Sequence, residues 1–217
     1  MSSTAVEHAH HDGPIDWPED AHYGTASAGK IGMWIFLLSD ALSFGGLLLA
    51  YAILRGGTKG PWVAAGEPAF GIPFTAGLTF LLICSSVTMV LAHAAAVEGD
   101  RKKLVTFLAL SALGGVLFLC GQAQEYFGVF HSLGMGHGLI EEGLKFGGSA
   151  RANTFFVTTS FHGAHVLTGT IYISIMAVRS AMGKYDHGNH NTIEILGLFW
   201  HFVDLVWILV FTFIYLL

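Results

Sequence analysis

The chain contains five long stretches that are almost free of charge, and they restrict the fold more than any other feature. They run over residues 31–54, 70–95, 104–128, 152–179 and 193–217. A helix that crosses the hydrocarbon core of a bilayer needs about 20 predominantly apolar residues, and every stretch is long enough. The stretches lack the apolar and polar alternation of a transmembrane strand, and backbone amides inside a bilayer must be bonded internally. The sequence therefore predicts an all-α polytopic membrane protein, a bundle of five transmembrane helices.

The composition agrees with this fold class. Of the 217 residues, 53% are hydrophobic and 12% are charged, whereas about a quarter of the residues in a soluble domain are charged. The net charge is -5 with 10 Lys and Arg residues, which provides no basic face for nucleic acid. We therefore expect no nucleic acid among its partners.

A polar, His-rich segment precedes the first stretch, over residues 1–29. It has neither the basic start nor the apolar core of a signal peptide. His8, His10 and His11 could chelate a metal, but the composition favours a flexible, solvated tail. Residues 30–217 then form a single transmembrane domain.

The basic residues between the spans predict the orientation. Five spans put the two chain ends on opposite sides of the membrane. The side of the N-terminus carries Lys30, Arg101, Lys102, Lys103, Arg179 and Lys184, and the other side carries Arg55, Lys59, Lys145 and Arg151. Since Lys and Arg accumulate in cytoplasmic loops, we expect the N-terminus in the cytoplasm and the C-terminus outside.

Several polar side chains fall at membrane depth, where a charged group is costly and usually faces protein or water. Asp40 interrupts the stretch "WIFLLSDALSFGGLLLAY", about 15 Å along the first helix at the usual rise per residue. By the same reasoning other His and Asp residues lie near the middle of their helices, and one Glu lies near the outer end of the third. The candidate site residues are Asp40, Glu125, His162, His165, His201 and Asp204.

Spacing predicts what these residues do. His162 and His165, like His201 and Asp204, are three positions apart and share a helix face. We expect them to form hydrogen-bonded contacts that join helices or touch lipid. Haem or copper ligation requires several converging imidazoles, and a proton relay through Asp40 requires polar groups above and below it. The sequence favours neither, so we predict no catalytic, cofactor-binding or metal-binding residue in this chain.

Small residues predict where helices approach closely. Ser160, Ala164 and Thr168 recur every fourth position, and Ser111 and Gly115 have the same spacing. Such stripes allow the backbones of membrane helices to come together.

Four motifs carry a resemblance to a known family. "WIFLLSDALSF", "QAQEYF", "NTFFVTTSFHGAHVLTG" and "WHFVDLVWILVF" resemble, in that order, motifs of subunit III of the haem-copper oxidases. The last two are the most specific, and the resemblance covers residues 30–217. Subunit III has seven spans in its larger form. The chain is similar to the shorter form, which has five spans and occurs in bacterial quinol oxidases and in some cytochrome c oxidases.

The resemblance implies a non-redox role in the bacterial inner membrane. In the family, haem and copper lie in subunits I and II, where oxygen is reduced and protons are pumped. Subunit III supports the catalytic subunit, holds phospholipid and helps to sustain proton uptake. The partners implied are subunits I and II, a larger respiratory supercomplex and membrane lipids. The family usually has Glu where this chain has Asp40, so the carboxyl group lies one methylene closer to the backbone.

The sequence thus predicts an accessory subunit III of a bacterial haem-copper terminal oxidase of the cytochrome c type. Alternatives are subunit III of a quinol oxidase and an accessory subunit of a nitric oxide reductase. Two further alternatives belong to other classes. One is a b-type haem anchor that uses His162, His165 or His201, and the other is a small transporter or proton channel.

Overall fold

The computed structural model describes residues 27–63, 66–130, 136–183 and 191–217. They form α1 (Ala28–Gly57), α2 (Ile72–Glu98), α3 (Arg101–Phe127), α4 (Ala150–Ala181) and α5 (Asn191–Val210), followed by the π-helix η2 (Phe211–Leu216). Five helices, with α5 and η2 taken as one, are long and apolar enough to cross a membrane, and the described residues contain no strand. The predicted all-α bundle of five transmembrane helices is confirmed.

Helix α1 begins inside the segment that the sequence assigned to the tail. Ser27 caps it, because its hydroxyl accepts a hydrogen bond from the backbone N–H of Lys30 at 3.3 Å. The end of the predicted tail over residues 1–29 is therefore helical. Residues 1–26, which include the three clustered His residues considered as metal ligands, lie outside the described part of the chain.

Helices α2 and α3 are joined by only two residues. Gly99 ends α2 with a φ of 75°, in the left-handed region that glycine adopts without strain. Asp100 then caps α3, since its carboxylate accepts a hydrogen bond from the backbone N–H of Lys103 at 3.1 Å. The short connection makes α2 and α3 antiparallel neighbours.

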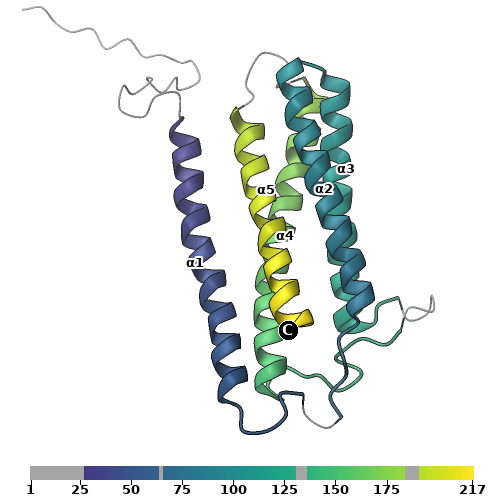
Figure 1. Ribbon diagram of the computed structural model, residues 1–217. Helices are drawn as coiled ribbons and strands as arrows, with labels where there is room; N and C mark the ends of the chain where they lie inside the picture. The colour runs from purple at the N-terminus through teal and green to yellow at the C-terminus, as the bar shows by residue number, and fades with distance from the viewer. Residues whose placement is uncertain (1–26, 64–65, 131–135, 184–190) are drawn as a thin grey trace, which may run out of the picture.

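Helix α1 lies at one side of the bundle, against α4 and α5, while α2 and α3 lie on the other side of α5 (Figure 1). Two contacts fix α1 beside the start of α5. The Ser27 hydroxyl donates to the side-chain carbonyl of Asn191 at 3.0 Å, and the Lys30 ammonium lies 2.7 Å from the Glu194 carboxylate. Helices α1 and α5 therefore run parallel.

The core is centred on two tryptophans of α5. Trp200 and Trp207 are buried, and their indole N–H groups donate to Ser85 at 3.1 Å and to Thr79 at 2.9 Å on α2. Gly115 of α3 lies against this layer, since a Cβ atom there would be 2.8 Å from Cη2 of Trp200. Because buried indole groups need a hydrogen-bond acceptor, these contacts set the rotation of α5 against α2.

The structure separates the two stripes of small residues. Ser111 and Gly115 are buried between helices, as the spacing predicted. Ser160, Ala164 and Thr168 are exposed on α4, so this stripe lies on the outer surface of the described bundle and its close packing against another helix stays a prediction. The Thr168 hydroxyl instead donates to the carbonyl of Ala164 at 2.9 Å.

Candidate functional site: polar groups between the helices

Asp40 of α1 and His165 of α4 are in direct contact. Nε2 of His165 lies 3.1 Å from Oδ1 of Asp40, and Nδ1 lies 2.8 Å from the carbonyl oxygen of Phe161. A carbonyl can only accept, so Nδ1 must carry a hydrogen. One further proton then lies in the contact between Nε2 and Oδ1, on the imidazole or on the carboxyl group. The pair can thus be an ion pair or two neutral groups, and its net charge is zero in both cases.

Aromatic rings enclose this pair. The ring of Phe44 lies 4.9 Å from that of Phe161 and 5.3 Å from the imidazole of His165, measured between centroids. Asp40 is buried, and its Oδ2 has no hydrogen-bond partner among the described residues. The pair is therefore shielded from the acyl chains and forms a polar connection between α1 and α4.

Within the described part of the chain, His162 lacks the polar contact that the sequence predicted. It is completely buried, and neither ring nitrogen has a hydrogen-bond partner among the described residues. Its ring packs 4.8 Å from Trp207 and 5.7 Å from Phe118, between centroids. Three residues correspond to about 300° of helix rotation, so the two side chains are about 60° apart around α4. Within this shared face His162 packs against α3 and α5, while His165 reaches α1.

A serine connects the two candidate residues of α5. Nδ1 of His201 lies 2.6 Å from the hydroxyl oxygen of Ser86 on α2, and Ser86 also interacts with the side chain of Asp204. Ser86 was missed in the sequence because serine is common in membrane helices. Its only signal is a polar side chain near the middle of its span.

Glu125 is held by hydroxyl groups near the end of the bundle opposite to the start of α1. Thr75 of α2 donates to Oε1 at 3.1 Å, and Tyr215 of η2 donates to Oε2 at 2.9 Å. All three side chains are buried. The sequence identified Glu125 but missed both partners, which belong to two different helices.

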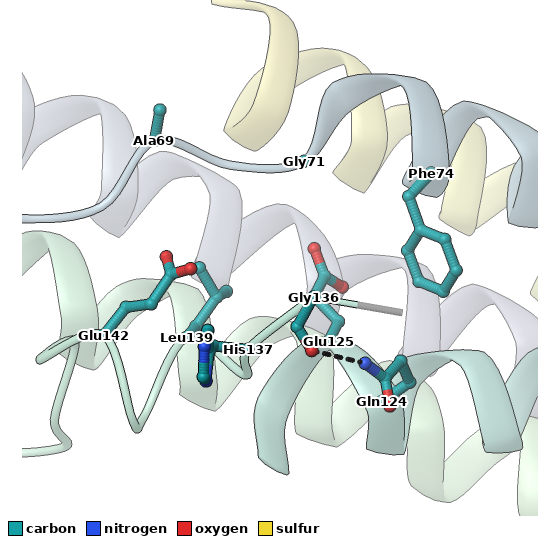
Figure 2. A pocket seen from close by; sticks show the side chains of 9 residues that line it. All are labelled: Ala69, Gly71, Phe74, Gln124, Glu125, Gly136, His137, Leu139 and Glu142. Atoms are coloured by element: carbon teal, nitrogen blue, oxygen red, sulfur yellow. Dashed lines mark hydrogen bonds between the residues drawn. The ribbon is translucent and has the colours of Figure 1, made fainter. Parts of the chain in front are cut away.

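A cavity lies beside this carboxylate, and its lining side chains are drawn in Figure 2. Its volume is about 320 Å³. It is lined by Ala69, Gly71, Phe74, Gln124, Glu125, Gly136, His137, Leu139 and Glu142. The amide nitrogen of Gln124 donates to the carbonyl of Gly136 at 3.2 Å, which ties α3 to the connection before α4. Since His137 and Glu142 are exposed, the cavity reaches the surface at this connection.

Arg151, counted in the sequence only as a basic residue of the outer side, is a buried clamp. Nη1 lies 3.0 Å from the Glu67 carboxylate, and both terminal nitrogens donate to the carbonyl of Pro68 at 3.2 Å. Its guanidinium also lies 4.2 Å from the ring centroid of Phe70. The start of α4 is thereby fastened to the segment that precedes α2.

The six candidate residues therefore occupy four separate places rather than one cluster. One is the pair of Asp40 and His165, and the others are centred on His162, on Ser86 and on Glu125. Among the residues that the structure describes, no group of three or more His, Cys, Asp or Glu side chains could hold a metal ion. The polar groups can join helices and hold protons at defined atoms.

These features define an integral membrane protein with five spans whose helices are linked by polar contacts. A family model described as "Cytochrome c oxidase subunit III" matches residues 19–217. The chain belongs to this family, and the predicted resemblance to subunit III of the haem-copper oxidases is confirmed. The family forms part of a multi-subunit oxidoreductase complex.

Three relatives illustrate the range of the similarity. The chain is 34% identical to "Cytochrome c oxidase subunit 3" of Corynebacterium diphtheriae, over 86% of each chain. It is 34% identical to the protein of the same name from Synechocystis, over 90% of this chain and 78% of the relative. It is 30% identical to "Cytochrome bo(3) ubiquinol oxidase subunit 3" of Pseudomonas aeruginosa, over 99% of this chain and 98% of the relative.

Proposed function

We propose that this chain is the accessory, non-redox subunit III of a bacterial terminal oxidase of the cytochrome c type. In this role it stabilises the catalytic subunit and supports its proton uptake during aerobic respiratory electron transport. The observation that carries the proposal is the family match over residues 19–217. The two relatives at 34% identity, both named cytochrome c oxidase subunit 3, support the choice of type.

In this proposal haem and copper lie in partner subunits I and II. The other partners of the chain are a larger respiratory supercomplex and membrane phospholipid. The membrane is the bacterial inner membrane, with the N-terminus in the cytoplasm. This orientation is supported by the basic run from Arg101 to Lys103 at the end of the bundle where α1 begins.

The buried polar residues have a structural role in this proposal. Asp40 with His165, and Glu125 with Tyr215, each connect helices that are far apart in the sequence. Rigid helix contacts of this kind would keep the membrane surface that meets the catalytic subunit in one shape. None of these residues is assigned a catalytic step.

A quinol oxidase is the second candidate. It is favoured by the Pseudomonas aeruginosa relative, which is named a ubiquinol oxidase subunit and is covered almost completely by the alignment. The two candidates predict different electron donors for the purified complex. Oxygen consumption with reduced cytochrome c supports the first proposal, and consumption with ubiquinol alone supports the second.

Co-purification tests the proposal as a whole. The chain, tagged and expressed in its own host, is extracted in mild detergent, and the proteins bound to it are identified by mass spectrometry. We expect a haem-copper catalytic subunit in stoichiometric amount, and no haem absorbance in the separated subunit III. Recovery of the chain without any oxidase subunit would refute the proposal, and stoichiometric haem in the separated chain would favour the haem-anchor alternative.

A further inference from the structure

An apolar groove runs along the membrane surface between α1 and α5. Its volume is about 380 Å³, and it is lined by Trp34, Leu37, Leu38, Ala41, Leu198, His201, Phe202 and Leu205. On each helix the lining residues follow the spacing i, i+3, i+4 and i+7, which places them on one face. The groove is therefore bounded by two matched stripes.

The two helices that form the groove are parallel and in register. Ser27 bonds to Asn191, and Lys30 pairs with Glu194, with the same difference in residue number in both contacts. The same difference relates the lining residues of α1 to those of α5. Parallel ridges of this kind are the surface against which a further helix packs.

His201 places a polar group in this groove at membrane depth. By the usual rise per residue it lies about 15 Å from the first residue of α5, near the middle of the span. Its Nδ1 lies 2.6 Å from the hydroxyl oxygen of Ser86. The imidazole is therefore oriented by Ser86 while it lines the groove.

The surface between α3 and α4 differs in this respect. It also carries an apolar groove, lined by Val116, Leu119, Cys120, Ala123, Leu167, Thr170, Ile171, Ser174 and Ile175. Those residues include no imidazole and no carboxylate. The Ser174 hydroxyl donates to the carbonyl of Thr170 within its own helix, at 2.7 Å. Oγ1 of Thr170, which has no hydrogen-bond partner among the described residues, is already buried, so acyl chains can cover this surface without breaking a hydrogen bond.

We propose that the groove between α1 and α5 is the docking surface for a transmembrane helix of a partner oxidase subunit. That helix presents a hydrogen-bonding side chain to His201 near the middle of the bilayer. This proposal rests on the proposed function. A helix is favoured over lipid because acyl chains have no hydrogen-bonding group at that depth, and polar side chains there usually face protein. Trp34, Leu38 and Leu205, which are 60%, 66% and 57% exposed, would be covered.

Photo-crosslinking in the intact complex tests which face is covered by protein. p-Benzoyl-phenylalanine is introduced at Leu38, on the rim of the groove, and as a matched control at Ile171 on the α3–α4 surface. Both are apolar helix residues, 66% and 53% exposed. We expect irradiated membranes to give a crosslink from Leu38 to a haem-copper oxidase subunit, identified by mass spectrometry, and only lipid adducts from Ile171.

The possible results separate this proposal from the proposed function. If the oxidase co-purifies but Leu38 captures lipid alone, the groove is a lipid site and the docking proposal is overturned. A crosslink to the oxidase from Ile171 alone would place the interface on the opposite face and overturn it too. If no oxidase subunit co-purifies at all, the proposed function fails as well.

Substitution of His201 tests the polar contact. His201→Leu removes the hydrogen-bonding group, and we expect the catalytic subunit retained after a detergent wash to fall about tenfold. His201→Gln keeps a side-chain amide that can bond to Ser86 and to a partner, so most of the retention should return. If His201→Leu and the wild type retain the same amount of catalytic subunit, the proposed contact of His201 is overturned.

Discussion

Asp40 and His165 hold one proton between them across 3.1 Å, and they join the outlying helix α1 to α4. Nδ1 of His165 donates to a backbone carbonyl, which leaves Nε2 for the carboxyl group. Because the pair is neutral as a whole, it avoids most of the cost of an isolated carboxylate inside the bilayer.

Substitution of Asp40 distinguishes a structural role from obligatory proton transfer. Asp40→Asn keeps a hydrogen-bonding side chain, so we expect assembly and a near-normal initial rate of oxygen consumption, with any loss appearing as slow inactivation over many turnovers. Asp40→Leu leaves Nε2 of His165 without its partner, at a cost of about 1–3 kcal/mol, and should inactivate faster. Both rates are measured with an oxygen electrode. Immediate loss of the initial rate in an intact Asp40→Asn complex would identify the carboxylate as an obligatory proton carrier.

Arg151 should contribute strongly to the stability of the bundle. Arg151→Ala removes the guanidinium that pairs with Glu67 and donates to the Pro68 carbonyl, and loss of one partner of a buried pair costs about 3–5 kcal/mol. Arg151→Lys keeps the charge but not the two-nitrogen contact, so its effect should be smaller. The measurement is the thermal unfolding midpoint in detergent, with the exposed Lys145→Ala as control. Equal midpoints for Arg151→Ala and the control would contradict the assignment of Arg151 as a clamp.

Gly115 should tolerate no side chain. A Cβ atom there would meet Thr170 and lie 2.8 Å from Trp200, and overpacking of this kind costs about 1–3 kcal/mol. Gly77→Ala is the matched control, since nothing lies within 4 Å of its added Cβ. We expect Gly115→Ala to lower the unfolding midpoint and the yield, and Gly77→Ala to leave both unchanged or slightly raised. If Gly115→Ala changes neither the unfolding midpoint nor the yield, α3 and α4 can move apart without loss of stability.

The cap of α3 should make stability depend on pH at the aqueous end of the bundle. The Lys103 backbone N–H that donates to Asp100 lowers the pKa of this carboxyl group below its ordinary value of 3.8. Because the pKa is lower in the folded state, the stabilisation is present above pH 3.8 and is lost as the pH falls through the lowered pKa. Asp100→Asn keeps the cap without this dependence.

The measurement compares unfolding midpoints of the wild type and Asp100→Asn between neutral and acidic pH. The difference between the two proteins should shrink as the carboxylate is protonated, although other groups will also titrate. If the difference in midpoint does not change with pH, Asp100 does not contribute to the pH dependence of stability.

The sequence determined how many helices cross the membrane and where each lies along the chain. That information is local, because each span must supply about 20 apolar residues and satisfy its own backbone hydrogen bonds. The family motifs lie in those spans, so membership could also be predicted from residues such as the "WHFVD" run that contains His201 and Asp204.

Only the tertiary structure decided which polar residues meet. Depth alone allowed Asp40 to face His162 or His165, and the structure selects His165 and leaves His162 among aromatic rings. Of their partners, Tyr215 gave no signal of its own in the sequence, and Ser86 gave only that of a polar side chain near the middle of its span. The physical reason is that depth follows from position along one helix, whereas a contact also depends on rotation and spacing between helices. Those are set by packing of the whole bundle, which no single span contains.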